Sequence, residues 1–498
     1  MTRISLLAVL LFTSLISCFA KTLHVGTGQP HSNLLSATRQ AQPGDTIFLR
    51  TGVYTGGQYI ENLQGTADKW IHILNFPNAN VIIRGSTEAW HFTDPNYLHI
   101  SGIIFEQQTG NGVNIDDSGS YDTPAHHVLI ENCIFRNMNA TGNNDLLKMS
   151  GVDEFEVRDC TFLNGATGGS GIDMVGCHQG LIHKNRFENL GSTGIQAKGG
   201  TQFVRIEANF FKNAGARALN LGGSTGLQFF RPIDATFEAA DLQVYSNVFM
   251  GSQAPVAYVG SVRVEVVNNT IYLPGKWVVR ILQETVDPNR FLQSGENSFI
   301  NNIIYFDNNV STAVNIGTNT RPNTFTFTNN LWYNYQNPNS SKPSLPVQES
   351  NGIVGQNPNF KDVNAEDFNL LPNSPAIAKG KQTSTPKTDF SGANFKQQRS
   401  IGALESGGTT SIQAIADNLE LTIFPNPSDG LLTIQLAEPI IQKGLLKVIN
   451  ADGRLVFSKI MNGESKVQLN LEQLPTGNYV IEMVINGRRM TGSWIKSK

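Results

Sequence analysis

Charged side chains are scarce in this chain of 498 residues. Asp, Glu, Lys and Arg together make up 15% of the sequence, whereas soluble domains typically carry about 25%. The formal net charge is only -3, and no basic stretch has the length or the interleaved aromatic residues of a nucleic-acid binder. Long apolar runs are equally absent beyond residue 20. We therefore expect no nucleic-acid partner and no transmembrane segment in the mature protein.

Cysteine is rare as well, and the four cysteines and nine histidines show no zinc-type spacing. Phosphate-binding loops and dinucleotide motifs are also missing. The mature chain would keep Cys133, Cys160 and Cys177, an odd number. Cys133 and Cys160 hold equivalent positions in neighbouring repeats, within range of a disulfide, but repeat-related side chains point the same way. We therefore expect buried free thiols.

The first 20 residues have the pattern of a signal peptide. Arg3 precedes an apolar run over residues 4–16, and Ala20 follows it. Such a run is too short to span a bilayer. Cleavage after Ala20 is the simpler prediction. Because residues 15–18 (Leu-Ile-Ser-Cys) also resemble a lipobox, a lipidated Cys18 is the alternative.

One eight-residue pattern occurs nine times between residues 98 and 332, and a unit that recurs in this way indicates a solenoid. Its third and eighth positions are apolar in every copy, and the copies end 22 to 38 residues apart. The copies end at Phe105, Phe135, Phe162, Phe187, Phe211, Phe249, Ile271, Ile304 and Trp332. The sixth position is Ile or Cys in the first three copies and Asn in the six that follow: Asn185, Asn209, Asn247, Asn269, Asn302 and Asn330.

This repeat predicts the architecture. Apolar and polar residues alternate within each copy, as in a strand with one buried face. Asn tolerates the backbone of a tight turn, and its amide can bond neighbouring backbone groups. On rungs ~4.8 Å apart, equivalent Asn side chains would form a ladder and the Phe rings would fill the interior. We therefore expect an all-β chain, a right-handed parallel β-helix solenoid followed by a small C-terminal β-sandwich. Unrelated strands of similar composition would not align six Asn residues.

Composition divides the chain into a signal peptide (1–20), a β-helix domain (21–405), a Gly/Thr/Ser-rich linker (406–418) and a C-terminal domain (419–498). Residues 32–41 predict a short amphipathic helix over the open end of the core. The last rungs fade after residue 350, where the sequence is typical of closing elements.

The N-terminal part resembles the chondroitinase B and alginate lyase group of the pectate-lyase-like superfamily. The segments that carry this resemblance are Gln-Pro-Gly-Asp-Thr-Ile (42–47), Gly-Val-Tyr (52–54), Gly-Thr-Ala (65–67) and Val-Ile-Ile-Arg-Gly (81–85). Similarity to the superfamily extends over residues 22–405, and similarity to the lyase group is best in the first hundred residues. The resemblance implies polysaccharide lyase activity.

The C-terminal domain shows short alternating strands, with Asp-Gly turns between some of them. It resembles the C-terminal sorting domain of the Bacteroidetes type IX secretion system. The matching residues are Phe424-Pro425-Asn426-Pro427, Asp452-Gly453-Arg454, Leu474 to Tyr479 (Leu-Pro-Thr-Gly-Asn-Tyr), and Lys496 and Lys498. The resemblance implies that the secretion machinery is a partner and that the protein is secreted or held on the outer cell surface. An ordinary carbohydrate-binding sandwich is the alternative.

A second strand precedes each octapeptide, and its outward side chains include the candidate site. Its second and fourth positions are almost all Val, Ile, Leu or Met, so the third and fifth must face outward. On four neighbouring rungs, spanning roughly 15 Å, the outward residues include Lys148, Asp173, Gln196, Lys198 and Asn220. A solvated face with a surface ion pair is the simpler alternative.

Two lysines beside a carboxylate fit β-elimination on a uronate polysaccharide. That reaction needs a group that neutralises the sugar carboxylate, a base for the C5 proton and an acid for the leaving oxygen. By the resemblance, Lys198 is the candidate base, with Lys148 and Asp173 beside it. The related lyases carry an Arg on the next rung, where this chain has Asn220 and Gly222, which puts the transferred mechanism in doubt. Substitutes for that Arg are Arg217, Arg231 and Arg280.

The longest insertion, residues 222–240, follows this rung, and loops on rigid scaffolds tend to carry function. We expect Phe230 to stack on a sugar ring, Arg231 to bind a carboxylate with two hydrogen bonds, and Glu238 to contact substrate. The alternative is that the loop packs its Phe residues on the flank of the solenoid. Trp277, near Arg280, is expected to pack.

The sequence therefore predicts an exported protein that acts on an acidic polysaccharide, most simply a lyase. A non-catalytic glycan-binding β-helix is the first alternative. A glycoside hydrolase is the second, because Asp116 and Asp117 resemble the acidic pairs of β-helix polygalacturonases. Calcium assists many related lyases, and Asp116, Asp117, Asp153 and Asp173 offer oxygen ligands, but no compact loop gathers them. The sequence leaves the sugar and the metal open.

Overall fold

The computed structural model describes residues 20–120, 122–406, 421–436, 443–450, 455–462, 466–485 and 488–497. The expected signal peptide and Cys18, nearly all of the linker, the Asp452–Arg454 motif and Lys498 lie outside these residues. Within them, no helix has the length and apolar character needed to cross a membrane.

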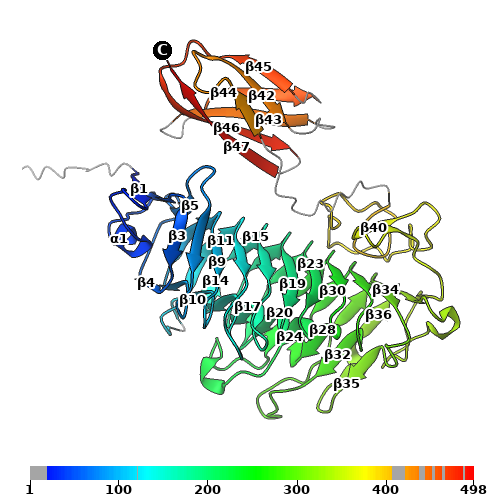
Figure 1. Ribbon diagram of the computed structural model, residues 1–498. Coiled ribbons are helices and arrows are strands. Elements are labelled where there is room, and N and C mark those ends of the chain that lie inside the picture. The colour runs from blue at the N-terminus through cyan, green and yellow to red at the C-terminus, as the bar shows by residue number, and fades with distance from the viewer. Residues whose placement is uncertain are drawn as a thin grey trace, which may run out of the picture.

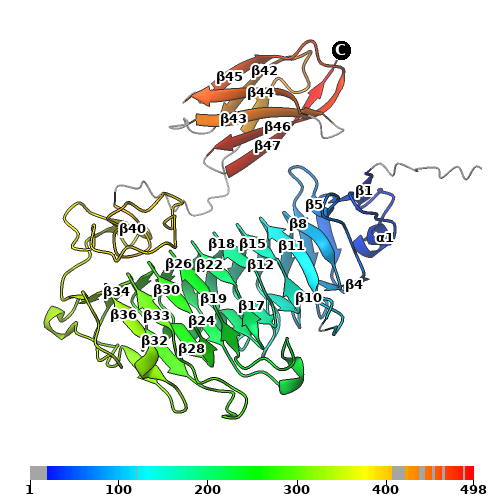
Figure 2. The ribbon, with the colours of Figure 1, turned by 180° about the vertical axis from the view of Figure 1, so that it is seen from behind.

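Three long parallel sheets, here named A, B and C, wind into a solenoid that confirms the expected β-helix (Figures 1 and 2). Sheet A contains β1 (Thr22–Val25), β2 (Thr46–Leu49), β5 (Ile71–Asn75), β8 (Asn96–Ser101), β11 (Ala125–Glu131), β15 (Glu156–Arg158), β18 (Leu181–His183), β22 (Arg205–Glu207), β26 (Gln243–Tyr245), β30 (Glu265–Val267), β33 (Ser298–Ile300) and β36 (Thr326–Thr328), with β14 (Val152–Asp153) beside β11.

Sheet B contains β3 (Gly52–Thr55), β6 (Val81–Arg84), β9 (Ile104–Glu106), β12 (Ile134–Arg136), β16 (Thr161–Leu163), β19 (Arg186–Leu190), β23 (Phe210–Ala214), β27 (Val248–Met250), β31 (Thr270–Tyr272), β34 (Ile303–Phe306), β37 (Leu331–Asn334) and β38 (Ile353–Val354). Sheet C contains β4 (Gln58–Glu61), β7 (Trp90–Thr93), β10 (Val113–Asp116), β13 (Leu147–Ser150), β17 (Ser170–Val175), β20 (Thr193–Lys198), β24 (Arg217–Gly222), β28 (Ala254–Val259), β32 (Val279–Leu282) and β35 (Val314–Ile316).

Each octapeptide forms a strand of sheet A, a sharp corner and a strand of sheet B. The corner holds a residue in the left-handed region, such as Lys184 with φ 55°, directly before the ladder Asn. The ladder is confirmed: Asn185 Nδ2 donates to Asn209 Oδ1 at 3.0 Å, and the same bond repeats up to Asn330. Each Nδ2 in the ladder also donates to a sheet A carbonyl, as from Asn185 to Val157 at 2.9 Å. The amides thus satisfy buried backbone groups at the corners from Asn185 to Asn330.

The Phe residues that end the copies stack inside the solenoid, as expected. Consecutive ring centroids from Phe135 to Phe249 lie 4.8 Å apart, which is the spacing of the rungs themselves. Cys133 and Cys160 hold the equivalent of the Asn position and are buried free thiols, as is Cys177. Cys160 Sγ accepts a long hydrogen bond from the Cys133 backbone N–H at 3.5 Å. The thiols therefore continue the ladder in weaker form.

The N-terminal end of the core is covered by a helix that is shorter than the expected 32–41. Helix α1 (Leu34–Thr38) packs against β1, β2 and β4. Asn33 caps it, because its side-chain oxygen accepts the Ser36 N–H at 2.9 Å. Its buried residues face the first rung.

The segment after the last rungs turns back along sheet B. Glu366 accepts hydrogen bonds from Arg186 at 3.0 Å and from Lys212 at 2.7 Å, both far earlier in the chain. Phe368, on β40 (Asp367–Leu370), which pairs with β39 (Phe360–Asp362), is buried on the outer side of the sheet. Residues 360–405 therefore cover the flank of several middle rungs as well as following the last one.

The C-terminal domain forms two small antiparallel sheets, as expected of a sandwich. One sheet contains β41 (Leu421–Phe424), β42 (Leu431–Leu436) and β45 (Lys466–Asn470). The other contains β44 (Leu455–Asn462), β43 (Lys443–Asn450), β46 (Gly477–Ile485) and β47 (Arg488–Lys496). Val448, Ile481 and Trp494 belong to its own hydrophobic core.

Candidate functional site

The register of sheet C agrees with the expected alignment at every rung from β10 to β35. Lys148 pairs with Asp173, Asp173 with Gln196, and Gln196 with Asn220, so these residues form one outward row. Lys198 stands two positions further along β20, opposite Val175. The alternation of buried and outward side chains in these strands brings the residues together on one face.

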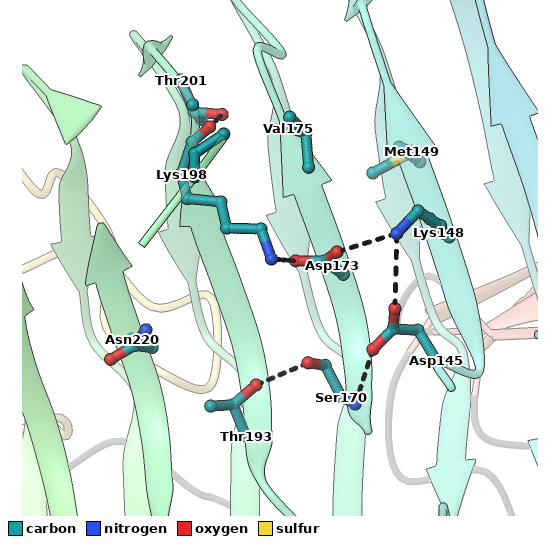
Figure 3. Close-up of polar contacts among 12 residues, drawn as sticks. Asp145, Lys148, Met149, Ser170, Asp173, Val175, Thr193, Lys198, Thr201 and Asn220 are labelled. Atoms are coloured by element: carbon teal, nitrogen blue, oxygen red, sulfur yellow. Dashed lines mark hydrogen bonds and ion pairs between the residues drawn. The ribbon is translucent and has the colours of Figure 1, made fainter. Parts of the chain in front are cut away.

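Asp173 lies between the two lysines and is 1% exposed (Figure 3). Lys148 Nζ donates to its Oδ2 at 3.3 Å. Lys198 Nζ lies 3.2 Å from Oδ1 as an ion pair, without the alignment of a hydrogen bond. The lysines are more accessible, with side chains 30% and 13% exposed. A buried carboxylate thus holds two amines at the surface of sheet C.

Asp145 completes the cluster, although the sequence did not single it out. Its Oδ1 accepts the Ser170 backbone N–H at 2.8 Å, and its Oδ2 lies 3.9 Å from Lys148 Nζ (Figure 3). Oδ2 is buried and has no hydrogen-bond partner. Burial, and then the charge of Asp173, raise the pKa of Asp145 to about 6. Because Asp145 precedes its strand, the alternating pattern does not include it.

The charge on Lys148 follows from two opposing effects. Burial lowers its pKa, whereas the carboxylates of Asp173 and Asp145 raise it, and the net pKa is above the ordinary value for lysine. Lys148 is therefore a fixed cation at neutral pH.

The next rungs add amide and guanidinium groups. Gln196 is half-buried, and Asn220 is buried and accepts a hydrogen bond from Arg217 Nη1 at 2.8 Å. Arg217 also donates to Glu284 at 2.9 Å. Arg217, three residues before Asn220, thus places a guanidinium group beside it on this rung.

Arg280 lies two rungs beyond Asn220 and keeps to the same face. Its Nε donates to Asn315 at 3.0 Å, and its guanidinium lies 4.5 Å from the ring centroid of Trp277. Burial and the neighbouring Arg217 lower its pKa from the ordinary value for arginine. Trp277 packs against Arg280, as the sequence indicated.

The insertion loop does not expose the side chains that we expected to contact substrate. Phe230 is fully buried against Phe291, so its ring cannot stack on a sugar. The exposed ring is that of its neighbour Phe229, at 60%. The alternative, in which the loop packs on the solenoid, holds for Phe230 but not for Phe229.

Arg231 and Glu238 anchor this loop. Arg231 forms two hydrogen bonds with the Asp153 carboxylate at 2.6 and 2.7 Å and is 8% exposed. Glu238 is 1% exposed and accepts the backbone N–H groups of Gly199 and Thr225, each at 2.9 Å. Because these partners occupy their polar atoms, neither side chain is available to substrate, contrary to expectation.

The loop also passes close to the lysine site at Gly223. A Cβ there would lie 3.0 Å from Gln196 Nε2 and 3.3 Å from Lys198 Cβ. A larger residue would therefore press on both side chains, and glycine lets the loop approach them closely.

The outward row begins earlier than the sequence indicated, with Tyr59 and His91 on β4 and β7. His91 Nε2 lies 2.6 Å from Asp116, and Nδ1 lies 3.1 Å from Glu88. Hydrogen bonds to Asp116 and then to Glu88 raise the pKa of His91 to about 9. These rungs were missed because the octapeptide pattern starts only at residue 98.

The aspartates considered as calcium ligands do not converge. Asp116 bonds His91, Asp153 bonds Arg231, and Asp173 bonds the lysines. Asp117 accepts the Gly119 backbone N–H at 3.0 Å. Across the part of the chain that the structure describes, no three His, Cys, Asp or Glu side chains group as a metal site. We therefore derive no step through a metal.

Two family models match the chain. Residues 82–271 match that of the right handed beta helix region, and residues 422–497 match that of the secretion system C-terminal sorting domain. Both resemblances stated from the sequence are thus confirmed at the level of fold and domain type. No curated protein matches the chain in sequence.

Solved structures show the same fold. The pectate lyase Pel9A matches with a TM-score of 0.51 and 13% identity, over 78% of this chain and 96% of that chain. XylC in complex with xylose matches at 0.46 and 11%, over 77% and 98%. An alginate lyase from Paenibacillus sp. str. FPU-7 matches at 0.41 and 16%, over 60% and 97%. At these identities only the fold is shared.

Proposed function

The chain is a right-handed parallel β-helix protein with a C-terminal sorting domain of a secretion system, and we propose that it is an exported polysaccharide lyase. The proposed substrate is an acidic polysaccharide that contains uronate residues, cleaved by β-elimination on sheet C. The observation that carries the proposal is the buried Asp173 between Lys148 and Lys198. A buried carboxylate that holds two amines toward solvent is a preorganised site for an anion.

Lys148 is the group that neutralises the substrate carboxylate. Asp173 and Asp145 raise its pKa, so it carries a full positive charge at neutral pH. A cation beside the uronate carboxylate stabilises the negative charge that develops when the C5 proton leaves. Its side chain is 30% exposed, which keeps the ammonium group within reach of a bound sugar.

Lys198 is the base in this proposal. Its side chain is 13% exposed, beneath the loop at Gly223, so a bound polysaccharide would remove most of its remaining water. Desolvation favours the uncharged amine that proton abstraction requires. The ion pair with Asp173 opposes this, so the proposal requires the bound substrate to separate Lys198 from Asp173.

Arg217 is the proposed hydrogen-bond donor that stabilises the leaving oxygen, which takes its proton from solvent. It lies on the rung after Lys198 and is oriented by Asn220 and Glu284. Gln196 lies on the rung before Asn220 and would bind sugar hydroxyl groups. Asn220 was expected to do so as well, but it is buried and its amide is bonded to Arg217 and to the Gly222 carbonyl, so it orients Arg217 and does not contact substrate. Arg280 extends the cationic row by two rungs and would bind a further uronate.

The test is the ultraviolet absorbance of the unsaturated product on alginate, pectate and glycosaminoglycans. We expect activity on one of them, and Lys198→Ala should lower kcat by on the order of 10²- to 10⁴-fold. Lys342→Ala, an exposed lysine outside the row, is the control and should change nothing. No product on any substrate, or full activity in Lys198→Ala, would refute the assignment. New reducing ends without unsaturated product would indicate a hydrolase.

A non-catalytic glycan-binding protein is the second candidate. The observation that favours it is that both lysines are ion-paired with Asp173, and that Asp173 and Asp145 raise the pKa of Lys148 above the ordinary value. Two fixed cations bind a uronate without removing a proton. This function predicts uronate binding that Lys148→Ala abolishes, with no product formed on prolonged incubation.

A further inference from the structure

The outer side of sheet A carries a row of side chains that the lyase proposal does not use. At the turn that enters sheet A, each of five neighbouring rungs places one residue in the left-handed region, with φ between 50° and 58°. The pairing of adjacent residues aligns these positions in one row. The row reads Tyr97, His127, Glu154, Gln179 and Phe203.

A depression of about 590 Å³ lies beside this row. The row residues His127, Glu154 and Gln179 form one side, and the outward residues Leu129, Glu156 and Leu181 form the other. Trp70 lines it as well and also lines a second depression of about 220 Å³ toward the N-terminal end. The lysine cluster belongs to sheet C and lines neither depression.

Aromatic rings stand at both ends of this surface. Trp70 contacts Tyr97 edge-on at 5.7 Å, and Tyr97 stacks on His127 at 4.4 Å between centroids. At the other end Phe203 is 55% exposed, although its φ is 58°. A bulky side chain in that region is strained, and an exposed one gains nothing from packing. The turn requires this conformation on every rung of the row, so what distinguishes Phe203 is the bulky, exposed ring placed there.

The polar groups between the rings are acceptors and an amide. Glu154 pairs with His127 at 2.9 Å and keeps its side chain 51% exposed. Glu156 pairs with His183 at 2.8 Å and is 34% exposed. Gly180 leaves room for the Phe155 ring that lines the depression, because a Cβ there would lie 2.0 Å from that ring.

We propose that this surface is a second saccharide-binding site, for a neutral oligosaccharide that lies along the solenoid axis. Aromatic faces accept the apolar side of a pyranose ring, while carboxylates and an amide bond its hydroxyl groups. From Tyr97 to Phe203 the row spans four rung spacings, about 19 Å. That length accommodates a short run of sugar residues.

The charge of the surface selects against uronates. Two glutamates line the larger depression, and neither Lys nor Arg does. A uronate carboxylate would face these carboxylates, which is unfavourable, because the nearby Arg158 is already paired with Glu156 and Glu131. Sheet C has the opposite character, with Lys148 and Lys198 in its row. The two faces would therefore hold different sugars, and this proposal does not depend on lyase activity.

The test uses the full chain and tryptophan fluorescence with calorimetry. The probes are cellohexaose, mannohexaose, xylohexaose and maltohexaose, with hexagalacturonate as the acidic comparison. Trp90, Trp332 and Trp494 are fully buried, so a change in emission reports on Trp70 or Trp277. We expect at least one neutral probe to bind, with Trp70→Ala weakening its binding on the order of tenfold. Phe203→Ala should weaken it less.

Trp277→Ala and Lys198→Ala are the matched controls, and both should leave this binding unchanged. Trp70→Phe and Glu156→Gln keep the proposal testable if Trp70→Ala misfolds, because the first keeps an aromatic ring and the second removes only a charge. Trp70→Phe should retain most of the affinity, and Glu156→Gln should weaken binding severalfold. The proposal would be overturned if none of the four neutral probes bound, if Trp70→Ala left binding unaffected, or if hexagalacturonate bound equally well at Trp70. Loss of lyase activity in Lys198→Ala with this binding intact would separate the two proposals.

Discussion

At the scale of single residues, Asp145 links the site to the stability of the fold. Its pKa of about 6 lies above the ordinary aspartate value of 3.8. Between these values the folded chain binds more protons than the unfolded chain, so Asp145 lowers the free energy of unfolding as the pH rises from about 4 to 6. Above pH 6 the buried charge of Asp145 lowers the free energy of unfolding by its full amount, up to about 3 kcal/mol. Each pH unit between the ordinary pKa and the folded pKa corresponds to about 1.4 kcal/mol.

Asp145→Asn should remove this dependence. The amide oxygen can still accept the Ser170 N–H, but no charge is buried. The stability of the variant relative to the wild type should therefore increase as the pH rises from 4 to 6 and level off above it. Urea unfolding at several pH values measures this difference. Asn144→Ala is the neighbouring control, and a difference that is flat or falls with pH would contradict the assignment.

Two arginines that the sequence grouped together should behave differently. Arg231→Ala leaves the carboxylate of Asp153 half-buried without its partner, which should destabilise the protein by about 3 kcal/mol. It should not change KM for a uronate polysaccharide. Arg217→Ala should do the reverse, lowering kcat with little loss of stability. Melting curves and initial rates on both variants test this, and a rate defect confined to Arg231→Ala would contradict it.

At the scale of structural elements, the Asn ladder stabilises the corners between sheets A and B. Asn247→Ala removes the acceptor of two bonds from Asn209 and the donor to Ile206 O and Asn269 Oδ1. Several buried backbone and side-chain groups lose their partners, so we expect a loss of about 3–5 kcal/mol. Cys160→Ala, at the equivalent position, loses only weak sulfur bonds and should cost about 1 kcal/mol. Similar losses in thermal unfolding of the two variants would show that the ladder is not what holds the corner.

The same repeat explains how much could be predicted. Strict alternation within each strand determines which side chains point outward, so the row of Lys148, Asp173 and Gln196 followed from the sequence. The insertion loop has no such period. The burial of Phe230 and the pairing of Arg231 depend on Phe291 and Asp153, which lie more than fifty residues away in the chain. The local sequence pattern gives no information about contacts between residues so far apart in the chain.

The element that returns along sheet B was missed for a related reason. Residues 360–405 have little regular structure, and their position depends on distant contacts, such as the ion pair of Glu366 with Arg186 and the packing of Phe368 against sheet B. Asp145 was missed because it stands just before its strand, outside the alternation. Side chains placed by the repeat were thus predictable, and side chains placed by turns and loops were not.

At the scale of the whole molecule, two faces of one solenoid differ in charge. Sheet C presents Lys148, Lys198 and Arg280, whereas the surface on sheet A presents Glu154 and Glu156. Salt screens attraction between a polyanion and exposed cations, so uronate binding should weaken severalfold from about 0.05 M to 0.5 M NaCl. Binding of a neutral oligosaccharide should be almost insensitive to the same change. Calorimetric titrations in both salts test this, and equal salt dependence of the two would contradict the division of charge.

The two domains should also have separate roles, because the stability of the β-helix should not depend on the C-terminal domain and export should. The sandwich has its own core around Trp494, separate from that of the β-helix, so each should fold without the other. A chain that ends at Ser406 should therefore keep the β-helix melting temperature within about 2 °C, since its core and the returning segment remain complete. It should lose export, because residues 422–497 match the sorting domain. Cell fractionation of the full and shortened chains in a host with the secretion system measures this. If the shortened chain were exported equally well, the domain would be a binding module and not a sorting signal.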